Sequence, residues 1–496
     1  MKKIFLKIII VCFCSLALFN SCKKALDTTP KNSLDLTFAL STREGLQATL
    51  ISIYDALQAS TYYGRDFIVI PELLTDNSEI TSNNTNRFIN QANNAPNAHV
   101  NIWAAAYRNI NRANLILGSI DNSQASASEK VLWKGEAYFL RAMFYADLIK
   151  TYARNPLYLN TSSAGVFNLG VPIIKTPVLD ATTITFPTRN TVTEVYDFIM
   201  QDLVLANSLL TNSGTGYRAR RVAAQALASR VELYRGNWVQ SERWADSVIL
   251  GGAVPLATAV TYFNLSATAP SWGNAHAETI FGLSYLIGEN SPGGEGLQYI
   301  NYRNLPSVQG YADVTTQTSL RNDMGTTGVA GTTSTDQRFT KLISIQVKSG
   351  QQVFYTMKWP GLKGNGAPGF DDIMILRTSE IILNRAEARA RQGGPKEVLA
   401  ITDLNQTRIR AGLVAFPTSG LGTPTGAALI AEILKERRIE LAFEGHRLWD
   451  ILRTGSDLIK SPANITLGSN AYNYLYANVL QADLDVNPNL VKNPGY

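Results

Sequence analysis

Two stretches of the chain share one layout, in which a helix, a glycine and a second helix follow one another. The first covers residues 223–250 around Gly236, and the second covers residues 380–410 around Gly393. In both, small side chains recur on one face of the first helix, which lets a second helix approach closely. This layout favours a body made of paired helices.

The helix–glycine–helix layout resembles a tetratricopeptide repeat. Gly236 and Gly393 are 157 residues apart, so the two copies are not in tandem. A simple solenoid is therefore not expected, and the repeats are interrupted by insertions.

Three further segments have the periodicity of helices. Apolar residues recur at three- and four-residue steps over residues 103–117, and a wide apolar stripe covers residues 129–153. Residues 191–210 begin with Thr191 and Glu194 at the spacing of a capping box. We predict an all-α fold, with tetratricopeptide-like helix pairs as a scaffold and long loop-rich insertions.

The insertions are rich in Gly, Asn, Ser, Thr and Pro. The two main ones lie near residues 58–100 and 255–375, and a third lies near residues 155–190. Long irregular segments within a compact domain are usually functional or disordered. These also carry aromatic residues, which favours a function.

The amino-terminal segment has the features of a bacterial lipoprotein signal, with three lysines and then an apolar run at residues 8–19. That run suits a signal peptide and is too short to cross a bilayer as a helix. The resemblance implies a signal peptide at residues 1–21, acylation of Cys22 and a lipid-anchored tether at residues 22–36. The alternative is an ordinary secretory signal with a chance cysteine. The remaining residues, 37–496, would form one domain.

Motifs for catalysis and metal binding are absent from the sequence. His99, His276 and His446 lie too far apart for a metal-ligand spacing. No P-loop, nucleophile elbow or dinucleotide-binding motif follows a strand. Asp371 and Asp372 are adjacent, but a glycoside hydrolase needs two carboxylates placed across a bond. We predict no enzyme activity, no catalytic residue, no metal site and no cofactor.

The net charge gives little support to a nucleic-acid partner. The chain has 45 basic and 39 acidic residues, but Lys2, Lys3 and Lys7 belong to the predicted signal. Without them, 42 basic residues face 39 acidic ones, a net charge of +3. We therefore predict no binding of nucleic acid.

Residues 432–453 are dense in charge. Arg437 and Glu440 are three apart, as are Glu444 and Arg447, which would place opposite charges on one face of a helix. We interpret this segment as an ion-paired helix held against the repeats, with an anion site as the alternative.

Aromatic residues in the insertions are the best signal of function. Sugars present apolar C–H faces and hydroxyl edges, so a glycan site needs flat aromatic rings and polar partners. The aromatic candidates are Tyr62, Trp272, Tyr299 and Tyr302, and the polar candidates are Asp66, Asn77 and Arg87. The alternative is that these rings simply hold the loops against the body.

Taken in order, a series of segments resembles the SusD/RagB family of Bacteroidetes outer-membrane nutrient-binding lipoproteins over nearly the full chain. The segments are SCKKALDTTP after the signal, WAAAYRNINRANLIL, GEAYFLRAMFYADLIKTYARNPLYL, TVTEVYDFIMQDL, RARRVAAQALASRVELYRGNW, ERRIELAFEGHRLWDILRTG and the ending NPNLVKNPGY.

The resemblance implies about four tetratricopeptide-like helix pairs and a loop-rich part that holds the ligand site. It implies outer-membrane attachment by lipid at Cys22, exposure at the cell surface, and capture of oligosaccharides or other nutrients. It also implies a partner, a SusC-like TonB-dependent transporter, which the protein would cover as a lid.

Two other classes remain open at this point. One is a surface glycoside hydrolase, which would release product from glycans. The other is a protein-interaction adaptor, whose repeats bind protein while its loops bind no glycan.

Overall fold

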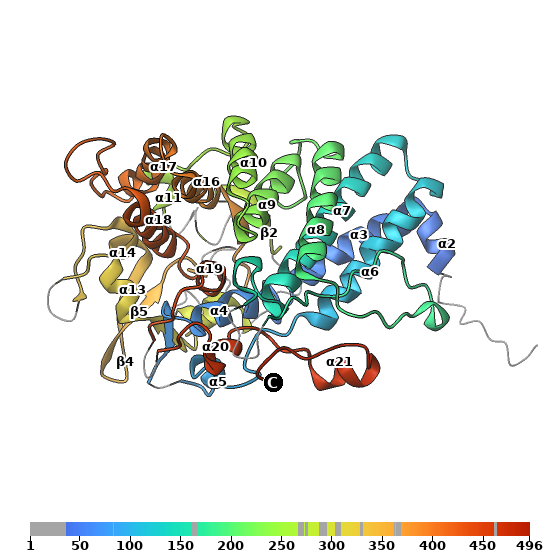
Figure 1. The fold of residues 1–496 in the computed structure, drawn as a ribbon, viewed down its shortest axis with the longest axis horizontal. Helices are drawn as coiled ribbons and strands as arrows, with labels where there is room; N and C mark the ends of the chain where they lie inside the picture. Colours follow the sequence, from blue (N-terminus) through green and yellow to red (C-terminus); the bar gives the residue numbers. More distant parts are fainter. Residues whose placement is uncertain are drawn as a thin grey trace, which may run out of the picture.

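A computed structural model of the chain describes residues 36–82, 84–160, 166–265, 272, 276–286, 295–302, 309–327, 331–361, 363, 369–460 and 464–496. Cys22 and nearly all of the predicted tether lie outside these residues. The part described is mostly helical, with helix pairs, loop insertions and a few small sheets, which confirms the predicted scaffold (Figure 1).

Four helix pairs form the scaffold in the described part of the chain. They are α3 (Arg43–Leu57) with α6 (Trp103–Ser119), α7 (Ala127–Tyr152) with α8 (Val192–Leu209), α9 (Arg221–Tyr234) with α10 (Trp238–Leu250), and α16 (Thr378–Gln392) with α17 (Lys396–Arg410). Each pair packs on the next through α6 and α7, α8 and α9, and α10 and α16.

Local sequence explains where these helices begin and turn. Thr191 and Glu194 form the predicted capping box of α8, and Ser126 with Glu129 forms another at the start of α7. Gly236, after α9, has a φ of 78°, a conformation that costs glycine little.

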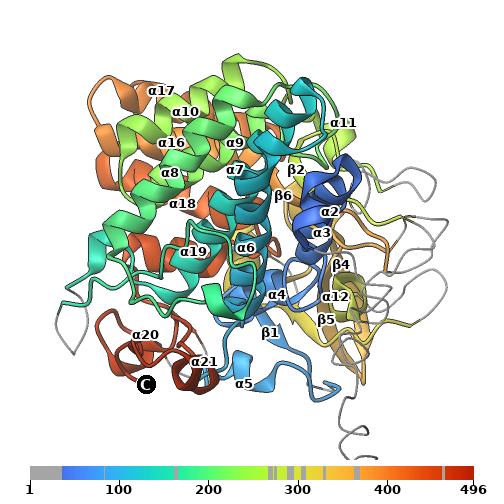
Figure 2. The same cartoon turned by 90° about the vertical axis from the view of Figure 1, so that its right-hand side faces the viewer.

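The insertions contain short elements rather than only loops. Their helices are α4 (Asp66–Leu73), α5 (Ile89–Ala92), α11 (Ala259–Tyr262), α12 (Leu297–Asn301), α13 (Thr318–Asp323) and α14 (Gln337–Leu342). Their strands form three antiparallel pairs, β1 (Ser78–Ile80) with β3 (Val314–Thr316), β2 (Thr279–Leu283) with β6 (Ile373–Arg377), and β4 (Ile343–Lys348) with β5 (Gln351–Thr356). Figure 2 shows α12, β4 and β5 on the side of the molecule away from α17.

The remaining elements are short or lie near the carboxyl end. They are α2 (Leu36–Ser41), η2 (Ile120–Asn122), η3 (Pro156–Tyr158), η4 (Ala181–Thr183), α18 (Gly426–Glu440), α19 (Arg447–Thr454), α20 (Asn470–Asn473) and α21 (Gln481–Val486). Within the residues that the structure describes, no helix combines the length and the apolar character needed to cross a membrane.

The charged segment 432–453 is two helices and not the single one predicted. Helix α18 ends at Glu440, and α19 begins at Arg447. The turn between them contains Phe443 and Gly445 at φ values of 67° and 78°, which a helix cannot include. A Cβ on Gly445 would lie 2.7 Å from the carbonyl oxygen of Phe67, so the turn also needs a glycine for space.

The predicted ion pairs along one helix face were therefore wrong. Arg437 pairs with Asp450 at 2.9 Å and Arg447 pairs with Asp76 at 2.7 Å. Glu440 instead joins a buried network with cations from other elements, and Arg377 reaches it at 2.8 Å. The segment is held against the body by ion pairs, and Arg437 and Asp450 also pair between its two helices.

Candidate ligand-binding surface

The two main insertions meet through a short antiparallel strand pair. Strand β1 of the first pairs with β3 of the second, with Ser78 opposite Thr316 and Ile80 opposite Val314. The pairing continues beyond the strands, because the Thr81 N–H donates to the Asp313 carbonyl oxygen at 2.9 Å. Residues more than 230 positions apart are thus fixed side by side.

Asp313 holds the loop that follows β1. Its side chain is fully buried, and its Oδ1 accepts a hydrogen bond from the Thr85 N–H at 2.9 Å. The Thr85 hydroxyl donates to the other carboxylate oxygen. This loop therefore has a fixed path, and it carries Arg87 outward beside the second insertion.

Arg87 lies over the ring of Tyr311, one of two neighbouring tyrosines at the surface. Its guanidinium carbon is 4.0 Å from the ring centre of Tyr311, a cation–π distance. The rings of Tyr311 and Tyr299 have centres 6.0 Å apart and are inclined at 41°. Both tyrosines and Arg87 are half-buried, so each keeps part of its side chain open to solvent.

Glu295 links Arg87 to a second arginine. It accepts from Arg87 Nη2 at 3.0 Å and pairs with Arg65, whose Nε also donates to Asp66 at 2.7 Å. Burial disfavours the charge on Arg87, but its hydrogen bond to Glu295 and the charges of Glu295, Tyr311 and Asp313 together outweigh burial and raise the Arg87 pKa. Burial raises the pKa of Asp66, although Arg65 opposes this. The result is a rim of alternating donors and acceptors beside the two rings.

The backbone under Tyr311 is fixed by a buried lysine. Lys348, at the end of β4, donates from Nζ to the carbonyl oxygens of Tyr311 and Ala312 and to the Thr81 hydroxyl, each at 3.0 Å. Gly310 lies so close to the neighbouring chain that a Cβ there would be 1.9 Å from the Tyr302 carbonyl oxygen. The ring of Tyr311 is therefore presented from a rigid base.

Of the seven predicted ligand residues, four lie in or beside this surface. Arg87 and Tyr299 are part of it, and Asp66 joins it through Arg65. Tyr302 follows α12 and is half-buried, with its ring 6.5 Å from that of the buried Tyr355.

Three of the predicted residues are buried rather than exposed. Tyr62 is 2% exposed and donates to Asp147 at 2.7 Å, while its ring stacks on Phe67 and Phe144. Asn77 is 1% exposed and donates to Glu72 at 2.7 Å. These side chains are satisfied inside the core, where a ligand does not reach them.

Trp272 is fully buried as well. Its Nε1 donates to the Tyr262 carbonyl oxygen at 3.0 Å, and its ring packs edge-on against the ring of Tyr262 at 5.4 Å. Lys358 lies 4.8 Å from the ring centre. Trp272 thus belongs to a core cluster with Tyr262, and this cluster does not include Tyr299 or Tyr311.

Sequence reasoning did not select Arg65, Glu295 or Tyr311 as ligand residues. The contact of Tyr311 with Arg87 depends on the strand pair between the insertions. Glu295 is 230 residues from Arg65 in sequence, and no local pattern relates the two.

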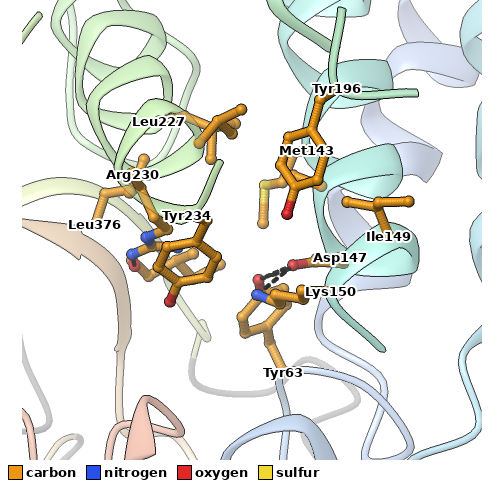
Figure 3. Close-up of a pocket in the computed structure, with 13 residues that line it drawn as sticks. Tyr63, Met143, Asp147, Ile149, Lys150, Tyr196, Leu227, Arg230, Tyr234 and Leu376 are labelled. Atoms are coloured by element: carbon orange, nitrogen blue, oxygen red, sulfur yellow. Dashed lines mark hydrogen bonds and ion pairs between the residues drawn. The ribbon is translucent and has the colours of Figure 1, made fainter. Parts of the chain in front are cut away.

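An internal cavity lies within the scaffold between α7, α8, α9 and β6. Figure 3 shows Arg230 and Tyr234 on one side of it and Met143, Asp147 and Lys150 on the other. Its volume is about 20 Å³, which is room for one water molecule. This cavity is too small for a nutrient ligand.

The part of the chain that the structure describes contains no group of three or more metal-binding side chains. Burial lowers the pKa of His99 and of His276 to about 4, so both imidazoles are neutral at pH 7. The arrangement of open rings, arginines and carboxylates is suited to binding.

Two family models match the chain. One is described as starch-binding, associating with the outer membrane, and matches residues 24–233. The other is the SusD family and matches residues 353–496. Together the two ranges cover more than half of the chain.

Comparison with individual proteins also gives a SusD-like protein. SusD-like protein P38 of Formosa agariphila is 25% identical over 489 aligned residues, covering 91% of this chain and 92% of that protein. The structure of a candidate sugar-binding protein of Bacteroides vulgatus is 26% identical with a TM-score of 0.76, covering 92% of this chain and 99% of that one.

A third similarity concerns the fold alone. A SusD superfamily protein of Bacteroides thetaiotaomicron is 24% identical with a TM-score of 0.74, covering 91% of this chain and all of that one.

The resemblance drawn from the sequence is confirmed. The chain belongs to the SusD/RagB family, whose members are non-catalytic carbohydrate-binding proteins associated with the outer membrane.

Proposed function

We propose that this protein captures oligosaccharides at the surface formed by Tyr299, Tyr302, Tyr311, Arg87 and Asp66. The observation that carries the proposal is the placement of two open tyrosine rings beside a rim of arginines and carboxylates. The rings suit the C–H face of a sugar, and the charged rim suits its hydroxyls, which both donate and accept.

The relatives support a carbohydrate as the ligand. One family model is described as starch-binding, and the Bacteroides vulgatus structure is that of a candidate sugar-binding protein. The non-catalytic character of the family argues against the surface hydrolase considered from the sequence. Which glycan binds depends on how its hydroxyls match the polar side chains, and binding measurements identify it.

A paired substitution tests the surface. Tyr299→Ala with Tyr311→Ala removes both open rings, and we expect about tenfold weaker binding, since an aromatic pair contributes about 0.5–1.5 kcal/mol beyond its buried area. Affinity electrophoresis against a panel of neutral and acidic polysaccharides identifies the ligand, and calorimetry with its oligosaccharides measures the change.

Tyr138→Ala is the matched control, because Tyr138 is a half-buried tyrosine beside an arginine on α7. It should bind as the parent does, and all variants should keep the parent's helical circular dichroism. Equal affinity of the double variant and the parent would exclude this surface. Failure of the parent to bind any polysaccharide would favour the adaptor alternative.

We also propose that the captured glycan passes to a SusC-like TonB-dependent transporter, with the helix pairs facing the barrel. Exposed arrays of helix pairs commonly serve as interaction scaffolds. Co-purification of the full chain with a barrel from outer membranes tests this partner, and recovery of the chain alone would count against it.

The proposed anchor is Cys22, which would carry acyl chains and hold the domain at the cell surface. More than one acyl chain gives stable attachment, whereas one alone is marginal. Cys22→Ala should move the protein from the outer-membrane fraction to the soluble fraction in cells lacking the transporter, with folding unchanged. Retention of the variant in the membrane fraction would refute the anchor.

A further inference from the structure

A second cavity lies where the larger insertion meets the last helices of the scaffold. It has a volume of about 190 Å³ and is bounded by the end of α13, the start of α14, the end of α17 and one face of α18. These four elements lie together at one end of the molecule (Figure 1). By the volume that water occupies in the liquid, the cavity has room for roughly six water molecules.

One face of α18 forms a continuous wall of the cavity. Glu432, Lys435, Glu436 and Ile439 line it, at the three- and four-residue spacing that places side chains on one helix face. Met324 and Leu413 join Ile439 as apolar lining. The cavity thus offers an apolar patch together with hydrogen-bonding groups, as sugar pockets require.

Two of the polar lining groups are deeply buried and held in place by ion pairs. Asp336 and Glu436 are 1% and 2% exposed, and both hold Arg338, at 2.7 Å and 2.6 Å. A carboxylate has several acceptor sites, so these groups can still accept hydrogen bonds from a ligand.

Most carboxylates around the cavity already have a cation as partner. Asp323 at the end of α13 pairs with Arg438 at 2.6 Å, and Arg408 lies 3.9 Å from Glu436. Of the four lining carboxylates, Asp323 thus has a partner, and Asp336 and Glu436 share Arg338. Arg408 and Lys435 are the lining cations. An ionic ligand would add a charge to groups that mostly have partners already, whereas a neutral group with both donors and acceptors would not.

We propose that this cavity is a second ligand site, which binds one neutral, hydroxyl-rich ring of monosaccharide size. Hydroxyls would donate to Glu432 and Glu436 and accept from Arg408 and Lys435, while a C–H face rests on Met324 and Ile439. The cavity shares no lining residue with the Tyr299 surface. This second site rests on the proposed function in one respect, which is that the ligand is taken to be a sugar.

Ligand-observed saturation-transfer NMR of the intact domain with D-glucose, D-galactose and D-mannose tests the site. Leu413→Trp narrows the cavity, and Glu432→Ala with Lys435→Ala removes two polar groups near its opening. We expect at least one neutral sugar to bind the parent, and both variants to bind it at least about fivefold more weakly, as for loss of a hydrogen bond.

Two further variants separate this site from the proposed surface. Lys341→Ala changes an exposed lysine on α14 that does not line the cavity, and should bind as the parent does. The Tyr299→Ala with Tyr311→Ala variant should keep the cavity signal. A signal lost only in the tyrosine variant would leave the proposed function intact and overturn the second site. The surface is tested separately, by the oligosaccharide calorimetry of the same tyrosine variant.

Two other results would overturn the proposal. One is that no neutral monosaccharide gives a signal that the cavity variants reduce, although circular dichroism shows the variants folded. The other is tighter binding of D-glucuronate or D-glucosamine than of the neutral sugars, because the assignment to a neutral ring would then be wrong.

Discussion

Asp371 is a buried carboxylic acid whose surroundings favour its neutral, protonated form. It is 4% exposed, and its Oδ2 accepts a hydrogen bond from the Gly361 N–H at 2.7 Å. Its Oδ1 has no hydrogen-bond partner among the described residues. Burial, with a contribution from the adjacent Asp372 carboxylate, raises the pKa of Asp371 to about 7. The folded protein therefore binds a proton near neutral pH that the unfolded chain has already released.

We predict that Asp371→Asn stabilises the protein increasingly as pH rises. The folded pKa lies above the unfolded value of about 3.9, so the parent loses stability between pH 4 and pH 7. An asparagine keeps the acceptor for Gly361 without the charge. At pH 8 the gain should be of the order of 2–4 kcal/mol, and it should shrink toward pH 5.

Urea unfolding at pH 5, 6.5 and 8 measures this difference. The same gain at all three pH values would show that the carboxyl group of Asp371 does not titrate in this range.

At the scale of elements, the β4–β5 hairpin supports the proposed ligand surface without belonging to it. Ser349 and Gly350 at its turn have φ values of 51° and 79°, the pattern of a tight hairpin turn. The preceding residue, Lys348, reaches back from the hairpin to the chain that carries Tyr311. The position of one ring thus depends on a strand that follows it by more than thirty residues.

We predict that Lys348→Met weakens glycan binding several-fold while lowering stability by about 1–3 kcal/mol, the cost of leaving buried carbonyl groups without donors. The Tyr311 backbone loses its clamp, so the two rings are no longer held together before the ligand binds. Calorimetry measures affinity, and urea unfolding measures stability.

Lys341→Met, on the exposed face of α14, is the control for the loss of a lysine. Unchanged affinity in a destabilised Lys348→Met protein would show that the clamp has only a structural role.

For the whole molecule, a buried ion network joins the larger insertion to the carboxyl-terminal helices. Glu440, at the end of α18, accepts from Arg377 Nη1 at 2.8 Å, from the Tyr262 hydroxyl at 2.8 Å and from Arg410. Burial disfavours its charge, but Arg410, Arg377 and Arg338 together hold the pKa of Glu440 well below its usual range. The charged form is thus part of the folded structure.

We predict that Glu440→Gln destabilises the protein by about 3–5 kcal/mol, because removing one partner leaves buried arginines without compensation. Glu44→Gln is the control, since Glu44 is exposed and its ion pair with Arg43 at 3.6 Å is a surface contact. Scanning calorimetry of both variants makes the comparison. A Glu440→Gln protein as stable as the control would show that the buried charge of Glu440 does not contribute to stability.

The sequence by itself determined the helical scaffold of this protein. Periodic apolar residues, the Thr191 capping box and the turn at Gly236 act between neighbours in the chain, so they can be read locally. The family followed from the order of such segments, and the placing of two insertions around one ligand site was an implication of that family resemblance.

The tertiary structure alone decided which aromatic residues remain open and which charges pair. Tyr62 and Tyr299 both lie in polar insertions, yet one stacks inside the core and the other lies at the surface. Glu295 meets Arg65 across 230 residues because β1 pairs with β3. Burial and ion pairing depend on what another part of the chain places against a side chain, and local sequence does not carry that information.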